Sequence, residues 1–184
     1  KVVLFSCKNL LKQIPKRSFL VKKSHLFLEK NLLFQIIWQI IYLPIYLKKN
    51  SSSILFSTDA SSFCKHKPSI VFNQDILSFD KEVLKRTPLG LQKIRLYLIR
   101  FIQISAMNKA SKIIFLSKFS QKIISKTLKK KNYEIIPHGI EKKLINLGKK
   151  NLKKPLWDYK KKKIIKLIYV SPLFYYKNQT IVAK

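Results

Sequence analysis

Glycine, acidic residues and cysteine are all scarce in this sequence. The three glycines, Gly90, Gly139 and Gly148, are too few and too scattered to form a glycine-rich phosphate-binding loop. The two cysteines, Cys7 and Cys64, have no spacing typical of a metal centre or a redox pair. We therefore expect each cysteine to be a small buried hydrophobic residue, with no metal site and no need for an oxidising compartment.

The shortage of acidic residues gives the chain a large positive charge. Lysine and arginine number 39 against 8 aspartates and glutamates, for a net charge of +31. Two interpretations stay open: the composition reflects AT-rich coding DNA, or the chain binds an anionic partner such as a membrane surface or nucleic acid. Lysine far outnumbers arginine, and no nucleic-acid-binding motif is present, so specific nucleic acid is not an expected partner. A basic nucleic-acid-binding protein remains an alternative function.

The longest apolar stretch is 26–47, and it is interrupted by amides and a proline. Asn31, Gln35 and Gln39 are spaced four residues apart and therefore share one face of a helix, and Pro44 follows. A membrane span needs about 20 mostly apolar residues. A single-span membrane protein is thus an alternative, but the amide stripe favours a helix that packs on a sheet with its amides facing outward.

Short apolar runs alternate with longer amphipathic segments, which predicts an α/β fold with a Rossmann-like parallel sheet flanked by helices. The run 113–116 has no polar residue and is typical of a strand buried on both faces. The helix predicted at 91–109 has one apolar face, which consists of Leu91, Ile94, Leu98, Phe101, Ile102 and Ser105. Segments 8–18 and 77–90 are expected to be irregular. The predicted strands are 1–5, 19–21, 54–56, 69–72, 113–116, 135–136 and 164–170, and a second helix is predicted at 121–131.

Polar residues follow several of these predicted strands. In a parallel sheet the carboxyl ends of the strands lie at one edge, where ligands bind. A strand, a helix starting at Ser117 or Ser120, and a second strand form one βαβ unit. The candidate site residues at this edge are Asp59, Gln74, Asp75, Ser117, Ser120, His138 and Gly139.

The order of these motifs resembles that of the retaining family-4 glycosyltransferases, which have the GT-B fold of two Rossmann-like domains. The motifs are I-I-F-L-S-K-F-S, then I-I-P-H-G-I, then L-I-Y-V-S-P-L-F-Y-Y-K-N-Q. The resemblance implies a fragment with three parts. Residues 1–141 would be part of the acceptor-side N-terminal domain, 142–163 a linker, and 164–184 the truncated start of the nucleotide-sugar-binding domain, with its first strand and helix.

The resemblance also implies an activity. The full-length protein would transfer a sugar from a nucleotide-sugar donor to a glycan or lipid-linked acceptor with retention, without a cofactor or metal, in cell-envelope polysaccharide synthesis. Lys177 matches the family lysine that contacts the donor diphosphate, and we expect it to precede a helix whose N–H groups also favour an anion. The expected location is cytoplasmic and peripheral, at the inner face of the membrane.

Four features depart from the family pattern. Pro172 replaces an arginine, so one diphosphate contact is missing, and Gln74 stands where many members have histidine, so it cannot transfer a proton. The glycine-rich loop is absent, and the acidic donor-domain motif would lie beyond Lys184. We therefore expect this fragment to be inactive and assign no catalytic residue. Asp75 either binds a sugar hydroxyl or closes a turn, the two serines are helix caps or cleft residues, and His138 is a turn or cleft residue.

Overall fold

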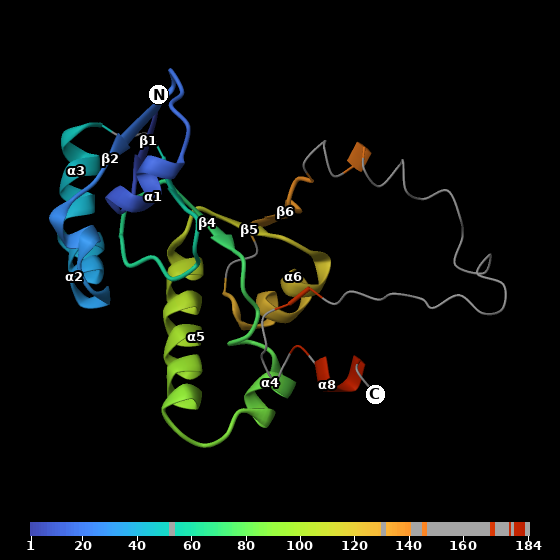
Figure 1. Ribbon diagram of the computed structural model, residues 1–184. Coiled ribbons are helices and arrows are strands. Elements are labelled where there is room, and N and C mark those ends of the chain that lie inside the picture. The colour runs from blue at the N-terminus through green and yellow to red at the C-terminus, as the bar shows by residue number, and fades with distance from the viewer. Residues whose placement is uncertain are drawn as a thin grey trace. The chain divides into compact units, whose positions relative to one another are not determined.

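The computed structural model describes residues 1–51, 54–129, 132–140, 145–146, 170–171, 177 and 179–182 (Figure 1). The chain divides into two compact units, Lys1–Pro137 and His138–Lys184. Most of the linker expected at 142–163, all but the last residue of the strand expected at 164–170, and Pro172 lie outside the described residues. The division into an acceptor-side domain, a linker and a donor domain therefore stays a prediction.

The first unit has an α/β fold built on a four-stranded parallel sheet, which confirms the predicted fold class. The spatial order β3-β4-β5-β6 is also the order in sequence. Because parallel crossovers are right-handed, successive helices in such a sheet are expected on the same face. The strands are β3 (Leu55–Ser57), β4 (Ser69–Asn73), β5 (Lys112–Phe115) and β6 (Tyr133–Ile135), and the crossover helices include α5 (Leu91–Lys109) and α6 (Lys118–Ile124).

One face of this sheet carries the main core. Ile113 and Phe115 of β5 are buried there against Met107 of α5 and Ile124 of α6. Side chains on the opposite face, such as Phe56, are exposed or only half-buried. The prediction that strand 113–116 is buried on both faces is therefore wrong, since alternate residues of β5 differ in burial. Both helices lie on the same side of the sheet, as the strand order requires.

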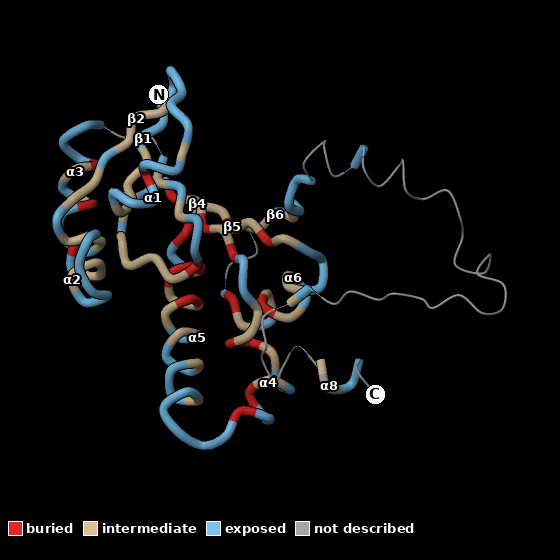
Figure 2. Tube along the Cα trace, viewed as in Figure 1, coloured by how far each residue is buried: buried red, intermediate tan, exposed pale blue. Residues whose placement is uncertain are grey.

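Helix α5 confirms the predicted helix at 91–109, but its predicted apolar face is not in the core. Leu91 and Phe101 are 85% and 73% exposed, whereas the buried positions are Gln103, Ala106 and Met107. A helix of 19 residues is about 28 Å long, while a strand of 5 residues spans about 17 Å. The N-terminal half of α5 therefore extends past the sheet, and Figure 2 shows the buried positions of α5 near its C-terminal end.

An N-terminal layer packs beside this sheet. Strands β1 (Val2–Phe5) and β2 (Leu20–Lys23) pair in parallel as a separate two-stranded sheet. The apolar stretch 26–47 forms a short 3-10 turn η1 (Leu26–Glu29), then α2 (Leu32–Ile37), the π-helical η2 (Trp38–Tyr42) and α3 (Leu43–Lys49). The π-helical turn immediately precedes Pro44, whose ring and missing N–H are incompatible with regular α-helical bonding.

This helical stretch buries one narrow stripe. Trp38, Leu43 and Leu47 form a small core with Phe5 of β1 and Leu55 of β3. Among the described helices none is long and apolar enough to cross a membrane. The alternative of a single span at 26–47 therefore has no support from these helices.

The prediction that the three amides face outward is wrong for Gln39 and incomplete for the others. The Oε1 atom of Gln39 accepts a hydrogen bond from the backbone N–H of Phe63 at 3.0 Å. Asn31 caps α2, since its Oδ1 accepts from the N–H of Phe34. Gln35 donates from Nε2 to the carbonyl of Lys30 at 2.9 Å. The four-residue spacing thus did not indicate what each amide contacts.

Helix α1 (Lys8–Gln13) lies in a segment predicted to be a loop. Its N-cap residue, Cys7, makes no side-chain capping bond. Glu29 supplies the missing acceptor, because its Oε1 accepts from the Lys8 N–H at 2.8 Å and from the Ser24 hydroxyl at 2.6 Å. At the other end the Lys22 ammonium donates to the carbonyls of Leu11 and Ile14. Groups distant in the sequence therefore stabilise both ends of α1.

Replacing Glu29 by Gln is expected to reduce the pH dependence of the free energy of unfolding of the first unit in the acidic range. The hydrogen bonds from Ser24 and from the Lys8 N–H lower the pKa of Glu29 below its ordinary 4.5; burial opposes them, and the Lys8 charge adds to them. A depressed carboxyl pKa gives stability that is present above the unfolded-state pKa and is lost as the pH falls through the folded-state pKa. The wild type should therefore have the higher free energy of unfolding above about pH 4.5, and its difference from Glu29→Gln should shrink as the pH falls below that value.

Urea unfolding of both proteins at about pH 7 and about pH 3 checks this. The matched control is Glu82→Gln, because Glu82 is an exposed carboxylate 4.0 Å from Arg86 within one short helix. The same gap between wild type and Glu29→Gln at both pH values would contradict the role given to Glu29.

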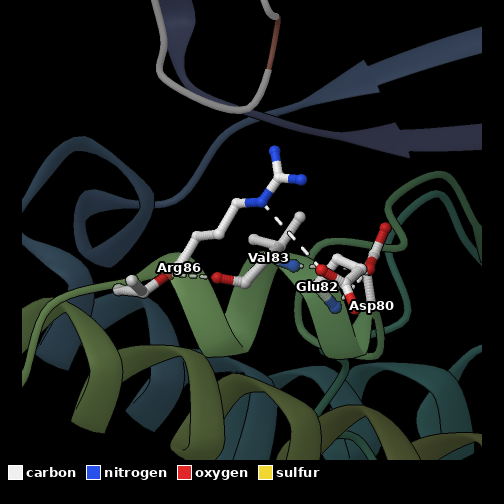
Figure 3. Close-up of polar contacts among 5 residues, drawn as sticks. Asp80, Glu82, Val83 and Arg86 are labelled. Atoms are coloured by element: carbon white, nitrogen blue, oxygen red, sulfur yellow. Dashed lines mark hydrogen bonds and ion pairs between the residues drawn. The ribbon is translucent and has the colours of Figure 1, made fainter.

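A second helix, α4 (Lys81–Arg86), lies in the segment 77–90 that was predicted to be irregular. The side chain of Asp80 caps it by accepting from the N–H groups of Glu82 and Val83, at 2.9 and 3.3 Å (Figure 3). Glu82 lies in the first turn and Arg86 in the last, which suits the helix dipole. Local capping therefore explains α4, and the prediction of an irregular segment was wrong here.

Candidate functional site

The carboxyl ends of β3, β4 and β5 lie at one edge of the sheet, as predicted. The parallel register aligns Ser57 with Val71 and Asn73 with Phe115. The turns after these strands carry Asp59, Gln74, Asp75 and Ser117, so four of the candidate residues share this edge. Two of the turns are joined directly, because the Nε2 of Gln74 donates to the carbonyl of Thr58 at 3.0 Å.

Asp75 closes a turn. Its Oδ1 accepts from the N–H of Leu77 at 2.9 Å, and its backbone carbonyl accepts from the Nδ2 of Asn73 at 3.1 Å. Of the two roles open to Asp75 from the sequence, the structure shows the local one. Asn73 is only 1% exposed, and its Oδ1 is buried without a hydrogen-bond partner among the described residues. The sequence gave no signal for Asn73, because a single amide before Gln-Asp resembles ordinary turn composition.

Ser117 is the N-cap of α6, and Ser120 hydrogen-bonds back to it. The hydroxyl oxygen of Ser117 accepts from the N–H of Ser120 at 3.1 Å, and the hydroxyl of Ser120 donates to the carbonyl of Ser117 at 3.0 Å. This places the start of α6 at Lys118, three residues earlier than the predicted helix at 121–131, and α6 ends at Ile124. The capping role is therefore shown for Ser117, while the Ser120 hydroxyl is occupied within the same turn.

Ser117→Ala is expected to destabilise the first unit by about 1 kcal/mol, because one N–H at the start of α6 loses its acceptor. Ser117→Asp should keep most of the stability, since aspartate is an equally good N-cap residue and its charge suits the helix N-terminus. Thermal unfolding of the three proteins measures this. An alanine variant as stable as the wild type would show that the cap contributes nothing.

A pocket of about 480 Å³ with a mixed polar and apolar lining opens between the N-terminal layer and β3, and we name it the edge pocket. It extends from the end of β1, at Ser6 and Cys7, to the turn after β3, at Thr58 and Asp59. Asp59 is the one acidic side chain among its described lining residues, and the Ser57 hydroxyl fixes this turn by donating to the Asp59 carbonyl at 2.8 Å. The other polar side chains of its wall are Gln35, Gln39, Ser61 and Ser62, and Trp38 adds an aromatic surface.

Sequence reasoning missed Gln35 and Gln39 as pocket residues. Their four-residue spacing was visible, but it was interpreted as a solvent-facing stripe. The length of the apolar stretch 26–47 could have indicated their position. A helical segment this much longer than the three-residue strand β3 can place amides near the carboxyl end of that strand. The cysteine prediction also needs correction, because Cys7 and Cys64 are only half-buried and free.

The remaining candidates belong to the second unit. His138 and Gly139 follow β6 in the chain, and a Cβ at Gly139 would meet no atom within 4 Å. Lys177 is exposed and lies two residues before the short helix α8 (Gln179–Val182). The structure therefore brings Asp59, Gln74, Asp75, Ser117 and Ser120 to one edge, while the relation of His138, Gly139 and Lys177 to that edge stays a prediction.

No family model, curated protein or solved structure matches this chain. The chemistry of the edge pocket is accordingly the main guide to function. One carboxylate, two amides and several hydroxyls beside an indole ring provide both hydrogen-bond donors and acceptors on a partly apolar wall. Such a wall suits a ligand with many hydroxyl groups. Among the described residues no cluster of three His, Cys, Asp or Glu side chains could hold a metal ion.

Proposed function

We propose that the full-length protein is a glycosyltransferase, which transfers a sugar from a nucleotide-sugar donor to a glycan or lipid-linked acceptor with retention. The observation that carries the proposal is the position of the edge pocket at the carboxyl ends of parallel strands, where α/β proteins bind their ligands. The motif order described above supports the same activity. The edge pocket is the acceptor site in this proposal, and Asp59 accepts hydrogen bonds from acceptor hydroxyls.

The donor site of this proposal lies in the second unit and includes Lys177. An ammonium group provides a point charge for a diphosphate, and the side chain of Lys177 is exposed to solvent. His138 and Gly139 are assigned to the turn between the acceptor and donor parts. No residue is assigned to acid–base chemistry, because Gln74 has no titratable group and the hydroxyls of Ser117 and Ser120 are both used in the turn that starts α6.

Lys177→Ala in the full-length protein is expected to weaken nucleotide-sugar binding by about tenfold or more, since a charge-assisted contact contributes about 1.5–3 kcal/mol. Calorimetric titration with a series of nucleotide-sugars measures this, and Lys85→Ala on α4 is the matched control for the loss of one exposed lysine. Equal donor affinity for both variants and the wild type would reject the donor site.

Asp59→Asn tests the acceptor side independently. It should leave donor affinity unchanged and lower transfer to the acceptor, while donor hydrolysis continues. A variant with unchanged transfer would remove Asp59 from the acceptor site.

We further propose that the protein works in the cytoplasm as a peripheral protein at the inner face of a membrane. The support is the combination of a net charge of +31 with exposed apolar residues on α5. Sedimentation with anionic and zwitterionic vesicles at low salt tests this, and equal partition to both would contradict it.

A further inference from the structure

A second pocket, which we name the α5 pocket, opens beside β3 on the helix-covered face of the sheet. Its volume is about 680 Å³, which lies in the range of about 300–1,000 Å³ typical of ligand sites. The pocket exists because the link between β3 and β4 contains no helix, so the α5 side of β3 has little cover. Its walls are the end of α5, the loop 62–67, β3, and Ile40 and Pro44 from the N-terminal layer.

The α5 pocket is apolar on two sides, one formed by the helical stretch that holds Ile40 and Pro44 and the other by α5. Ile40 on one side is 51% exposed and Phe101 on the other is 73% exposed. The same two helical stretches carry further exposed apolar residues outside the pocket, Ile41 and Ile45 on one and Leu98 on the other. Exposed apolar side chains on two helical stretches that both line one pocket mark an interaction surface rather than scattered surface residues.

The loop side of the α5 pocket is positively charged. Lys65 and Lys67 of the loop and Lys109 of α5 line it, and no aspartate or glutamate does. Within the described residues none of these three lysines forms an ion pair. The Nε2 atom of His66, in the same loop, is buried and has no hydrogen-bond partner among those residues. The pocket therefore combines an apolar wall with three uncompensated ammonium groups and one unused imidazole nitrogen.

We propose that the α5 pocket binds a single anionic membrane lipid, with a hydrocarbon chain against Ile40, Ile102 and Phe101 and the lipid phosphate beside Lys65, Lys67 and Lys109. An apolar chain alone would leave the lysines uncompensated, and a free phosphate would leave the apolar wall uncovered. A lipid provides both, and the exposed apolar residues of η2, α3 and α5 then contact the surrounding bilayer. This inference stands apart from the sugar-transfer proposal, because binding at the α5 pocket needs neither donor nor acceptor.

The two cysteines provide a direct test, because each lines a different pocket. Cys64 lines the α5 pocket and Cys7 lines the edge pocket. Alkylation of both thiols is followed by mass spectrometry at alkaline pH, since burial raises the pKa of the Cys64 thiol and slows its reaction at neutral pH. The ligand is a short-chain phosphatidylglycerol kept below its critical micelle concentration. At about nine times its Kd, it should slow the labelling of Cys64 about tenfold and leave Cys7 unchanged.

Two variants and a control separate the α5 pocket from general charge attraction. The triple variant Lys65→Gln, Lys67→Gln and Lys109→Gln should abolish protection of Cys64 by the lipid. The control triple variant Lys81→Gln, Lys85→Gln and Lys118→Gln removes the same charge outside the pocket, and in this variant the lipid should still protect Cys64. Ser105→Phe places a ring inside the pocket and should also abolish protection. Thermal unfolding verifies that each variant is folded. If Ser105→Phe does not fold, the two lysine variants still test whether the lipid binds in the α5 pocket.

Two further ligands separate the parts of the lipid. Short-chain phosphatidylcholine should protect Cys64 more weakly, and glycerol phosphate without chains should not protect it. Equal protection of Cys7 and Cys64, equal loss in the pocket and control lysine variants, or full protection by glycerol phosphate alone would each overturn the proposal.

Discussion

Phe115→Ala is expected to destabilise the first unit by about 3–5 kcal/mol. Phe115 is fully buried at the centre of the main core, in β5, between the neighbouring strands β4 and β6. Its ring packs edge-on against Tyr133 of β6, with ring centroids 5.8 Å apart. Removing it leaves a cavity between α5, α6 and the sheet that surrounding side chains cannot fill without moving a strand. Since domains are stable by about 5–15 kcal/mol, this one change should bring the unit close to its unfolding limit.

Chemical denaturation of the wild type and Phe115→Ala measures the loss. The matched control is Phe119→Ala, because Phe119 is a phenylalanine on the nearby helix α6 that is 63% exposed. We expect the control to change the unfolding free energy by less than about 0.5 kcal/mol. Similar losses for the two variants would mean that the core is not centred on β5.

Trp38→Ala is expected to have an equally large effect, about 3–5 kcal/mol, but on a different part of the unit. Trp38 packs on Phe5, with ring centroids 5.1 Å apart, and belongs to the small core that joins α3 to β1 and β3. Among the described residues that core has three buried side chains, and the indole of Trp38 is the largest of them. The N-terminal layer should then open while the four-stranded sheet stays folded.

Hydrogen exchange distinguishes this local opening from global unfolding. In Trp38→Ala the amides of β1, β2 and α3 should exchange rapidly while those of β4 and β5 stay protected. Ile45→Ala is the control, because Ile45 lies on α3, directly after the π-helical turn that holds Trp38, and is 61% exposed. The edge pocket should also be lost with Trp38, which lines it. Uniform loss of protection across the unit would show that the two cores unfold as one.

The sheet was predictable from the sequence because each strand carries its own signal. Compact apolar runs bounded by polar turns identified β3, β4 and β5, and the helical segments between β4, β5 and β6 favoured parallel pairing of those three strands. Helix α4 was missed although its signals are local, since Asp80 before Lys81 and Arg86 at the end form a capping pattern. Helix α1 had no such pattern. Glu29 and Lys22 hold it from other elements, and those contacts exist only after folding.

The position of the candidate site at one edge of the sheet was predictable from the sequence, but the walls of its pockets were not. Parallel strands place their carboxyl ends together, so the shared position of Asp59, Gln74 and Ser117 followed from the strand order. The exposed faces of α5 did not follow, because apolar periodicity gives the direction of a face but not whether another element reaches it. The walls of both pockets depend on how long each helix is relative to the strands beside it. No residue pattern within one segment carries that information.

The match between strand order and sequence order also has a consequence for how the first unit folds. Ile70 of β4 pairs with Lys112 of β5, whereas Ile113 of β5 pairs with Tyr133 of β6. The first closure spans about twice as many residues as the second, which costs about 0.6 kcal/mol more in loop entropy. The β5-α6-β6 segment should therefore assemble early and serve as the template onto which β4 docks, once α5 has formed and brought the earlier chain back to it.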